Sequence, residues 1–130
     1  MRPERGSDAK KVLIQDEERE VHRVGLVPAW VQPGFVSPQA FLPRPQDKGS
    51  LSALDKGCSA AEALDNWNSR FKPAPCVLTV TVAQARAQAL SVYDDSPEGA
   101  HHVAIEADDP GLWELAAEEL ARLCAVHPRP

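Results

Sequence analysis

The sequence predicts an α+β fold with one small mixed or antiparallel sheet, about three helices and a long, ordered, proline-rich loop. Three observations favour this class. Short apolar segments with β-branched residues or period-two alternation, typical of strands, recur along the chain. They are separated by amphipathic segments that begin with capping residues, typical of helices. Finally, 43% of the 130 residues are hydrophobic and 25% are charged, which is typical of one globular domain.

Residues 1–19 are expected to form a disordered, charged tail, and residues 20–127 a single domain of helices and strands. The tail mixes both charge signs, and its one sizeable apolar cluster is Val12-Leu13-Ile14. The alternation of polar and apolar residues at 20–24 then predicts a first, short strand.

The proline-rich segment, residues 26–45, is predicted to be an ordered, winding loop. Its prolines lack an amide donor and restrict the residues before them, which excludes a long helix or a central strand. Its apolar residues are too bulky and numerous for a solvated linker, so they are expected to hold the loop against the core. They are Trp30, Phe35, Val36, Phe41 and Leu42.

Strands and helices are predicted in the remainder of the chain. Strands are expected at residues 50–54, 76–82 and 102–107, and the second of these is β-branched enough to be central in the sheet. A helix from Ser59 to about residue 71 begins with capping-box spacing and ends before a proline. A short, alanine-rich helix is expected at residues 83–90, followed by an acidic loop at residues 93–99.

The last helix is predicted from Asp109 to about Val126. Asp109, followed by a proline, is typical of an N-cap before the first helical residue. Glu118 and Arg122 are expected to pair on the outer face, and His127 to complement the dipole at the helix C-terminus. The inward stripe is expected to comprise Leu112, Ala116, Leu120, Leu123 and Cys124.

The charge is −5 overall, but residues 91–130 hold two basic and nine acidic side chains, a net of −7. Since phosphate binding needs clustered Lys and Arg, general nucleic-acid binding is not expected. Apolar runs are far shorter than the ~20 residues of a membrane span, and the first residues lack a secretory signal. A cytoplasmic location without membrane contact is therefore expected, while the oligomeric state stays open.

No metal site and no cofactor are expected. His101 and His102 are adjacent, so on a strand they point to opposite faces and do not bind one ion in the usual way. There is no glycine-rich phosphate loop and no nucleophile-elbow sequence. The three cysteines, Cys58, Cys76 and Cys124, are an odd number at wide spacing, which indicates reduced thiols.

Several short motifs follow one another along residues 20–125. Those of the first half are Val21-His22-Arg23-Val24, Pro28-Ala29-Trp30-Val31, Val36-Ser37-Pro38-Gln39-Ala40-Phe41 and Leu51-Ser52-Ala53-Leu54. Those of the second half are the Arg-containing helix at 83–90, the acidic proline loop and His102-Val103-Ala104-Ile105.

Together these motifs resemble a family of small, uncharacterised bacterial proteins, often described as hypothetical, although Glu106-Ala107 stands where a glycine is expected. The resemblance implies no known reaction. It implies that certain residues gather on one side of the sheet, beside the proline-rich loop: Arg23, Ser37, Phe41, Ser52 and His102. An early Arg, a Ser step and a later His also resemble, loosely, the layout of ADP-ribosyltransferase-like folds, without their catalytic Glu.

The leading hypothesis is a non-enzymatic accessory or partner-binding module. Its proline-rich loop would dock onto a partner protein, with Trp30 and Phe35 as anchors. Arg23, Ser37 and Phe41 complete the candidate binding residues. This hypothesis predicts an exposed apolar patch.

The alternative is an enzyme that processes a nucleotide or another phosphate ligand. Arg23 would bind the phosphate through two parallel hydrogen bonds, Ser37 or Ser52 would orient it, and His102 would act as acid or base. This hypothesis predicts a concave pocket where Arg23, Ser52 and His102 converge. An exposed strand residue without such a role is the simpler interpretation of Arg23.

Overall fold

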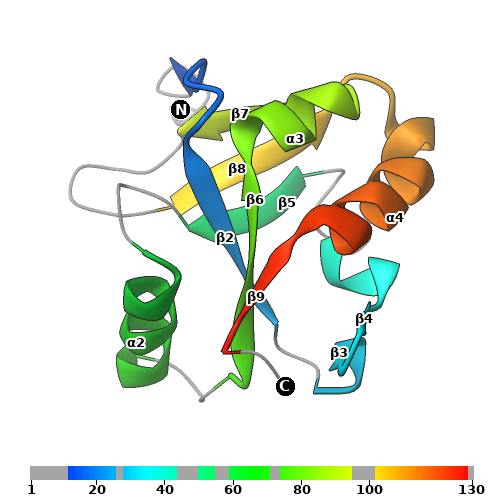
Figure 1. The fold of residues 1–130 in the computed structure, drawn as a ribbon. Coiled ribbons are helices and arrows are strands. Elements are labelled where there is room, and N and C mark those ends of the chain that lie inside the picture. The colour runs from blue at the N-terminus through cyan, green and yellow to red at the C-terminus, as the bar shows by residue number, and fades with distance from the viewer. Residues whose placement is uncertain are drawn as a thin grey trace, which may run out of the picture.

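The computed structural model describes residues 12–25, 28–43, 50–54, 59–70, 74–94 and 102–128. Its fold is α+β, as predicted, and a seven-stranded sheet organises it (Figure 1). The strand order is β1-β7-β8-β5-β2-β6-β9, and each pair of neighbours is antiparallel. The strands are β1 (Val12–Leu13), β2 (Glu20–Gly25), β5 (Ser50–Leu54), β6 (Cys76–Thr81), β7 (Leu90–Asp94), β8 (His102–Ala107) and β9 (Ala125–His127).

Three α-helices and a small hairpin accompany this sheet. The α-helices are α2 (Ala60–Arg70), α3 (Val82–Ala87) and α4 (Trp113–Leu123). The 3-10 helices are η1 (Pro28–Trp30), η2 (Pro38–Phe41) and η4 (Pro110–Leu112). The proline-rich loop is ordered over residues 28–43, and it contains η1, η2 and the hairpin of β3 (Val31–Gln32) and β4 (Phe35–Val36).

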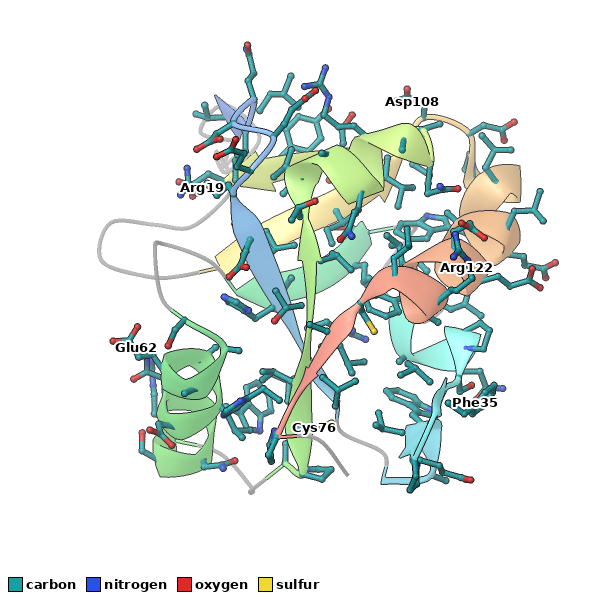
Figure 2. All side chains as sticks on the ribbon, viewed as in Figure 1. Arg19, Phe35, Glu62, Cys76, Asp108 and Arg122 are labelled. Atoms are coloured by element: carbon teal, nitrogen blue, oxygen red, sulfur yellow. The ribbon has the colours of Figure 1, made fainter. Side chains whose placement is uncertain are left out.

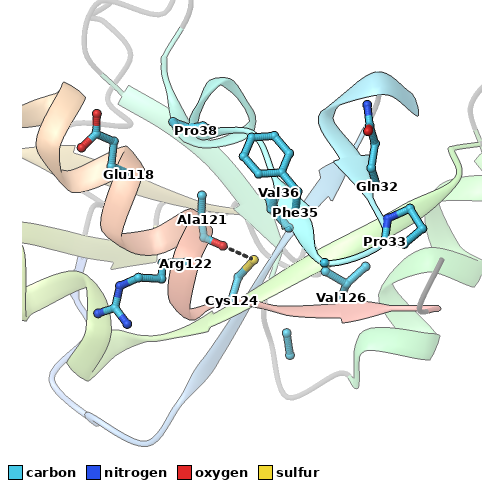
Figure 3. A pocket seen from close by; sticks show the side chains of 12 residues that line it. Gln32, Pro33, Phe35, Val36, Pro38, Glu118, Ala121, Arg122, Cys124 and Val126 are labelled. Carbon is cyan, nitrogen blue, oxygen red and sulfur yellow. Dashed lines mark hydrogen bonds between the residues drawn. The ribbon is translucent and has the colours of Figure 1, made fainter.

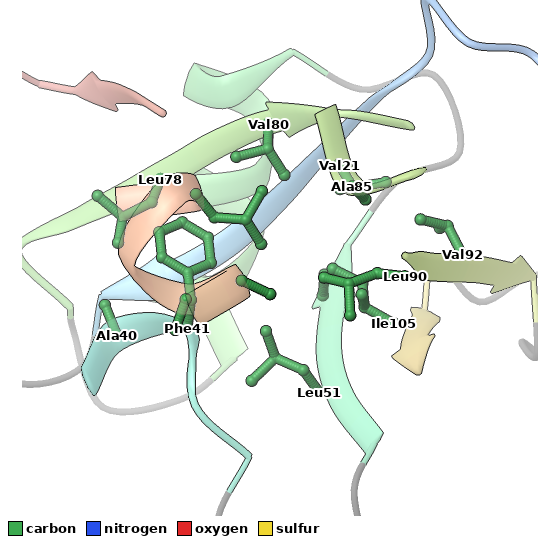
Figure 4. Close-up of a cluster of buried hydrophobic side chains, with 14 of the residues drawn as sticks. Val21, Ala40, Phe41, Leu51, Leu78, Val80, Ala85, Leu90, Val92 and Ile105 are labelled. Atoms are coloured by element: carbon green, nitrogen blue, oxygen red, sulfur yellow. The ribbon is translucent and has the colours of Figure 1, made fainter. Parts of the chain in front are cut away.

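The alternation of side chains along the strands gives the sheet two different faces. The main core lies on the face that α3, α4 and η2 cover, where Val21, Leu78 and Phe41 are almost completely buried (Figure 4). On the other face, α2 packs over β2 and β6, and its Ala63 contacts a smaller core with Val24 and Val77. Strand β6 pairs with β2 on one side and with the edge strand β9 on the other, so it is an interior strand and is buried on both faces, as its β-branched sequence predicts.

A buried polar pair lies on the α2 face of the sheet. His22 is completely buried, and its Nδ1 is hydrogen-bonded to Thr79 Oγ1 at 2.8 Å. The two residues are directly opposite each other on β2 and β6. A buried polar group needs such a partner, because an unsatisfied one costs free energy on folding.

The predicted helix starts at Ser59 and Asp109 are confirmed by their capping hydrogen bonds. Ser59 N–H donates to Glu62 Oε1 (2.8 Å), and Glu62 N–H donates to Ser59 Oγ (3.1 Å), which is a complete capping box. Asp109 Oδ1 accepts from Gly111 N–H at 2.9 Å, although the first turn after it is the 3-10 helix η4.

The structure differs from the predicted tail of residues 1–19. Strand β1 pairs with β7, and Ile14 N–H donates to Val92 O at 2.8 Å, which places Ile14 in the main core at 4% exposure. Three apolar residues in a charged segment were enough to complete a sheet edge, because β7 supplies the hydrogen-bond partners. Residues 1–11 lie outside the described part of the chain.

The alanine-rich helix ends earlier than predicted, and a strand replaces the start of the acidic loop. Helix α3 stops at Ala87, and Ala89, directly after the C-cap Gln88, has a φ of 62°, the left-handed conformation in which helices commonly end. Strand β7 then buries Leu90 and Val92 against the main core. The alternation in its sequence is a period-two pattern that the neighbouring alanine-rich segment obscures.

The last helix is also shorter than predicted. Helix α4 ends at Leu123, which is 36% exposed, and the chain continues as β9 along β6. His127 therefore lies on an edge strand and not at a helix C-terminus. Arg122 pairs with Glu119, one turn away at i,i+3, and not with Glu118.

Candidate functional site

An apolar groove lies between the β3–β4 hairpin, the C-terminal end of α4 and strand β9 (Figure 3). Its volume is about 620 Å³. The walls are formed by Gln32, Pro33, Gly34, Phe35, Val36 and Pro38 on the hairpin side, and by Glu118, Ala121, Arg122, Cys124, Ala125 and Val126 on the other. The proline-rich loop and the end of the chain, which are far apart in sequence, meet here.

The hairpin wall is positioned by a tight turn. Pro33 and Gly34 connect β3 to β4, and the φ of 77° at Gly34 is typical of the third residue of a type II turn, where glycine is favoured. Val36 packs against the main core, while Phe35, the residue before it on the strand, is 56% exposed. Figure 2 labels its side chain on the hairpin. The turn therefore presents one large aromatic ring to solvent beside the groove.

The base of this hairpin is fixed by the residues around Ser37. Ser37 N–H donates to Trp30 O at 2.7 Å, and Ser37 Oγ accepts from Gln39 N–H at 3.2 Å as the N-cap of η2. Trp30 is half-buried against the main core. Because both ends of the hairpin are held in this way, Phe35 projects from a well-supported element.

The α4 wall combines a buried alanine with charged residues at the rim. Ala121 is 7% exposed, whereas Glu118 and Arg122 are exposed. Arg122 Nη2 and Nε donate to Glu119 Oε1 (2.7 Å) and Oε2 (3.2 Å), and these hydrogen bonds lower the pKa of the Glu119 carboxyl. Glu118 forms no ion pair with a described residue, so the α4 rim carries an uncompensated negative charge.

Cys124 lines the groove but is a poor nucleophile. Its Sγ donates to Ala121 O at 3.5 Å, the dashed line in Figure 3. Burial raises the pKa of the Cys124 thiol to about 11, so it stays protonated at neutral pH. Burial also raises the pKa of the Cys76 thiol. The third cysteine, Cys58, lies outside the described residues.

Strand β9 has a free edge beside the groove, and the sheet's hydrogen bonds define its orientation. Val82 N–H donates to Arg19 O at 2.9 Å, so residues 19 and 82, one position beyond the paired ends of β2 and β6, form a hydrogen-bonded pair in the same register. Such pairs alternate along an antiparallel ladder. Val77 and Thr79 therefore direct their main-chain groups away from β2 and towards β9.

Opposite Val77 and Thr79 on β9 are His127 and Ala125, whose main-chain N–H and C=O groups are directed towards β6. Val126, between them, directs its N–H and C=O away from the sheet. No described strand lies beyond β9. The groove thus includes one main-chain donor and one acceptor at an open sheet edge.

The structure brings together only some of the residues proposed from the sequence. Arg23 lies beside the proline-rich loop, where its Nε donates to Ala40 O at 3.0 Å. Phe35 lines the groove, and Ser37 and Trp30 support the hairpin beside it. Phe41, with no exposed surface, belongs to the main core, so in this conformation its side chain contacts no partner.

The predicted convergence of Arg23, Ser52 and His102 in a pocket involves two side chains that lie outside the described part of the chain. The main chains of Ser52 and His102 lie on β5 and β8, but their side chains are outside the described part. The groove is lined by none of the three residues.

No group of three or more His, Cys, Asp or Glu side chains in the described ranges could hold a metal ion. None of the helices built from the described residues is long and apolar enough to cross a membrane.

Sequence reasoning identified Phe35 but missed the other walls of the groove. The far wall depends on the end of α4 and on β9, both of which were predicted as continuous helix. A signal was present: Val126 is β-branched, and Pro128 follows closely, which disfavours continuation of a helix.

The fold and the groove define an α+β domain with an apolar groove beside a free sheet edge. Comparisons of this chain with protein-family models, with curated proteins and with solved structures find no match.

Proposed function

We propose that this protein is a non-enzymatic accessory or partner-binding module, and that the groove beside Phe35 is where a partner protein docks. The observation that carries the proposal is the exposed Phe35 ring next to an apolar groove of about 620 Å³. Aromatic residues at the centre of interfaces are frequent hot spots, because their burial contributes a large apolar area. Trp30 and Ser37 hold the base of the hairpin that carries Phe35.

The chemistry of the groove favours binding over catalysis. Its one thiol is held protonated, and its one arginine is paired with Glu119. The Nε of Arg23, the residue expected to bind a phosphate in the enzyme hypothesis, donates to Ala40 O. We extend the proposal to a cytoplasmic protein of the uncharacterised bacterial family that the motifs resemble.

Site-specific photo-crosslinking tests this proposal. The full-length chain would carry p-benzoylphenylalanine at position 35 or, as a control, at position 115, and would be irradiated in its host cells. Leu115 is 65% exposed on α4 but does not line the groove. We expect a discrete protein adduct from position 35 that is absent from position 115.

The adduct would then be identified by mass spectrometry, and the purified partner titrated against the unlabelled protein. Since burying a Phe side chain contributes about 1.5–3 kcal/mol, Phe35→Ala should weaken binding at least about tenfold. Leu115→Ala should leave it unchanged. No adduct at position 35, or equal effects of the two substitutions, would show that the groove is not the docking site.

A further inference from the structure

We infer that the groove takes an extended segment of a partner protein, which adds as a short strand to the free edge of β9 and carries a Lys or Arg beside Glu118. This inference rests on the proposed docking function and specifies the chemistry of the partner. Three features of the groove lead to it: an open main-chain edge, an apolar anchor site and an uncompensated acidic rim.

The open edge favours an extended main chain over a helix. Val126 directs its N–H and C=O outward at the last strand of the sheet, where an added strand would satisfy both. Strand addition to a sheet edge is a common mode of peptide recognition, in which main-chain hydrogen bonds contribute affinity and side-chain pockets contribute specificity. Because β9 is only three residues long and a proline follows it, the added ladder is short.

The apolar anchor site lies beside that edge. Val126 is half-buried, and its side chain packs towards the main core, on the same side as Val36 of the hairpin. A strand added at β9 directs alternate side chains to this face. One of them would meet the Phe35 ring and the apolar floor of the groove.

The negative charge at the rim of the groove favours a basic residue next to the apolar anchor of the bound partner segment. Glu118 lines the groove, and Glu114 lies one turn earlier on the same side of α4, both exposed and without an ion pair to a described residue. The arginine that lines the groove, Arg122, is already engaged by Glu119. A cationic side chain on the segment is therefore complementary to this wall.

The probe is a phage-displayed library of random dodecapeptides, selected on the immobilised full-length chain. Selected sequences are expected to contain an apolar residue followed closely by Lys or Arg. They would be synthesised, and their dissociation constants measured by fluorescence anisotropy against the wild-type protein and Phe35→Ala. Binding should fall at least about tenfold in the variant, because the anchor is lost.

Two further measurements address the strand and the charge. The backbone amides of the best peptide would be N-methylated one at a time. We expect a loss of about tenfold at the amide that donates to Val126 and little change at its two neighbours, since alternate amides of an added strand point away. Glu118→Lys should weaken the same peptide at least about threefold, whereas Asp65→Lys, the same charge change on exposed α2, should not.

The outcomes separate the inference from the function on which it rests. If peptide binding depends on Phe35 but not on any single amide, or not on Glu118, the inference is wrong and the docking proposal stands. If no peptide is enriched while a folded partner still binds through Phe35, the inference is again wrong and the docking proposal stands. Binding that Phe35→Ala leaves unchanged contradicts both the inference and the docking proposal.

A second copy of the chain is another occupant that the test distinguishes. Light scattering would compare the wild-type protein with Phe35→Ala. A wild-type dimer that becomes monomeric in the variant would identify a second copy as the occupant and overturn the inference.

Discussion

Phe35 and Phe41 come from one proline-rich loop, yet one lies on the surface and the other in the core. The difference is set by local geometry. Phe35 follows the Pro33-Gly34 turn of a hairpin, while Phe41 ends the 3-10 helix η2, which packs under α4. Only the first ring is available to a partner.

Substitution of the two rings should therefore lower the free energy of unfolding by very different amounts. Phe41→Ala removes a ring with no exposed surface and leaves a cavity, which should lower the free energy of unfolding by about 3–5 kcal/mol. Phe35→Ala, at a site 56% exposed, should lower it by less than about 1 kcal/mol. Urea denaturation followed by tryptophan fluorescence measures both. Similar losses for both variants would contradict the placement of the rings.

Cys124 provides a pH-dependent prediction at the same scale. Because its thiol pKa is raised from the usual 9.0 to about 11 by burial, alkylation by iodoacetamide should be slow at pH 8 and increase with a midpoint near pH 11. The unfolded chain releases this proton first, so the free energy of unfolding should fall as the pH rises from 9.0 towards 11.

Mass spectrometry of the Cys124 peptide, alkylated over a range of pH, gives the profile. The protein unfolded in guanidinium is the control and should give a midpoint near the usual value. Identical profiles for the folded and unfolded protein would show that Cys124 is not buried as the structure has it.

At the scale of elements, capping chemistry proved the most informative pattern in the sequence. Ser59 and Glu62 form the predicted reciprocal hydrogen bonds at the start of α2. A second capping box, between Thr81 and Gln84, was not predicted from the sequence; it starts α3 at Val82, directly after β6. Such starts are legible because both partners lie three residues apart, within one helical turn.

Removal of the α2 cap should measurably weaken the domain. Ser59→Ala leaves Glu62 N–H without its acceptor and should lower the free energy of unfolding by about 1 kcal/mol. Asn66→Ala, at an exposed position within the same helix, is the matched control and should cause no loss, because alanine has the higher helix propensity. Chemical denaturation measures the free energy of unfolding of both variants. Equal decreases in the two would exclude a capping role for Ser59.

Element ends were harder to predict than element starts. The last helix stops at Leu123, because the following residues gain more by pairing with β6 as strand β9 than by continuing a helix. That pairing partner lies almost fifty residues earlier in the chain, beyond the reach of local patterns. The groove depends on this change from helix α4 to strand β9, because residues of both elements line it.

At the scale of the whole molecule, the N-terminal strand is part of the domain and not of a tail. Strand β1 lies at one edge of the sheet and β9 at the other, so the two ends of the described chain are at opposite edges (Figure 1). Ile14, next to β1, fills the main core beneath β7.

This placement predicts that Ile14→Ala lowers the free energy of unfolding by about 2–5 kcal/mol, because a cavity is left at a site 4% exposed. Val12→Ala, at a site 62% exposed on the same edge, should change it by less than about 0.5 kcal/mol. Thermal or urea unfolding of the full-length variants tests this. A negligible effect of Ile14→Ala would restore the view of residues 1–19 as a tail.

The sequence by itself determined the α+β class, strands β2, β5, β6 and β8, the start of α2 and the ordered proline-rich loop. Those features depend on local periodicity, capping and the covalent limits of proline, all of which act within a few residues. It also identified Phe35 as a candidate anchor.

Only the tertiary structure decided which aromatic ring of the loop is exposed, that β1, β7 and β9 are strands, and that a groove exists. Each of these depends on pairing or packing between segments distant in sequence: β1 needs β7, β9 needs β6, and Phe41 needs α4. Short apolar segments take the conformation that their long-range partners stabilise, because their own preferences are weaker than the burial and hydrogen bonds that those partners supply.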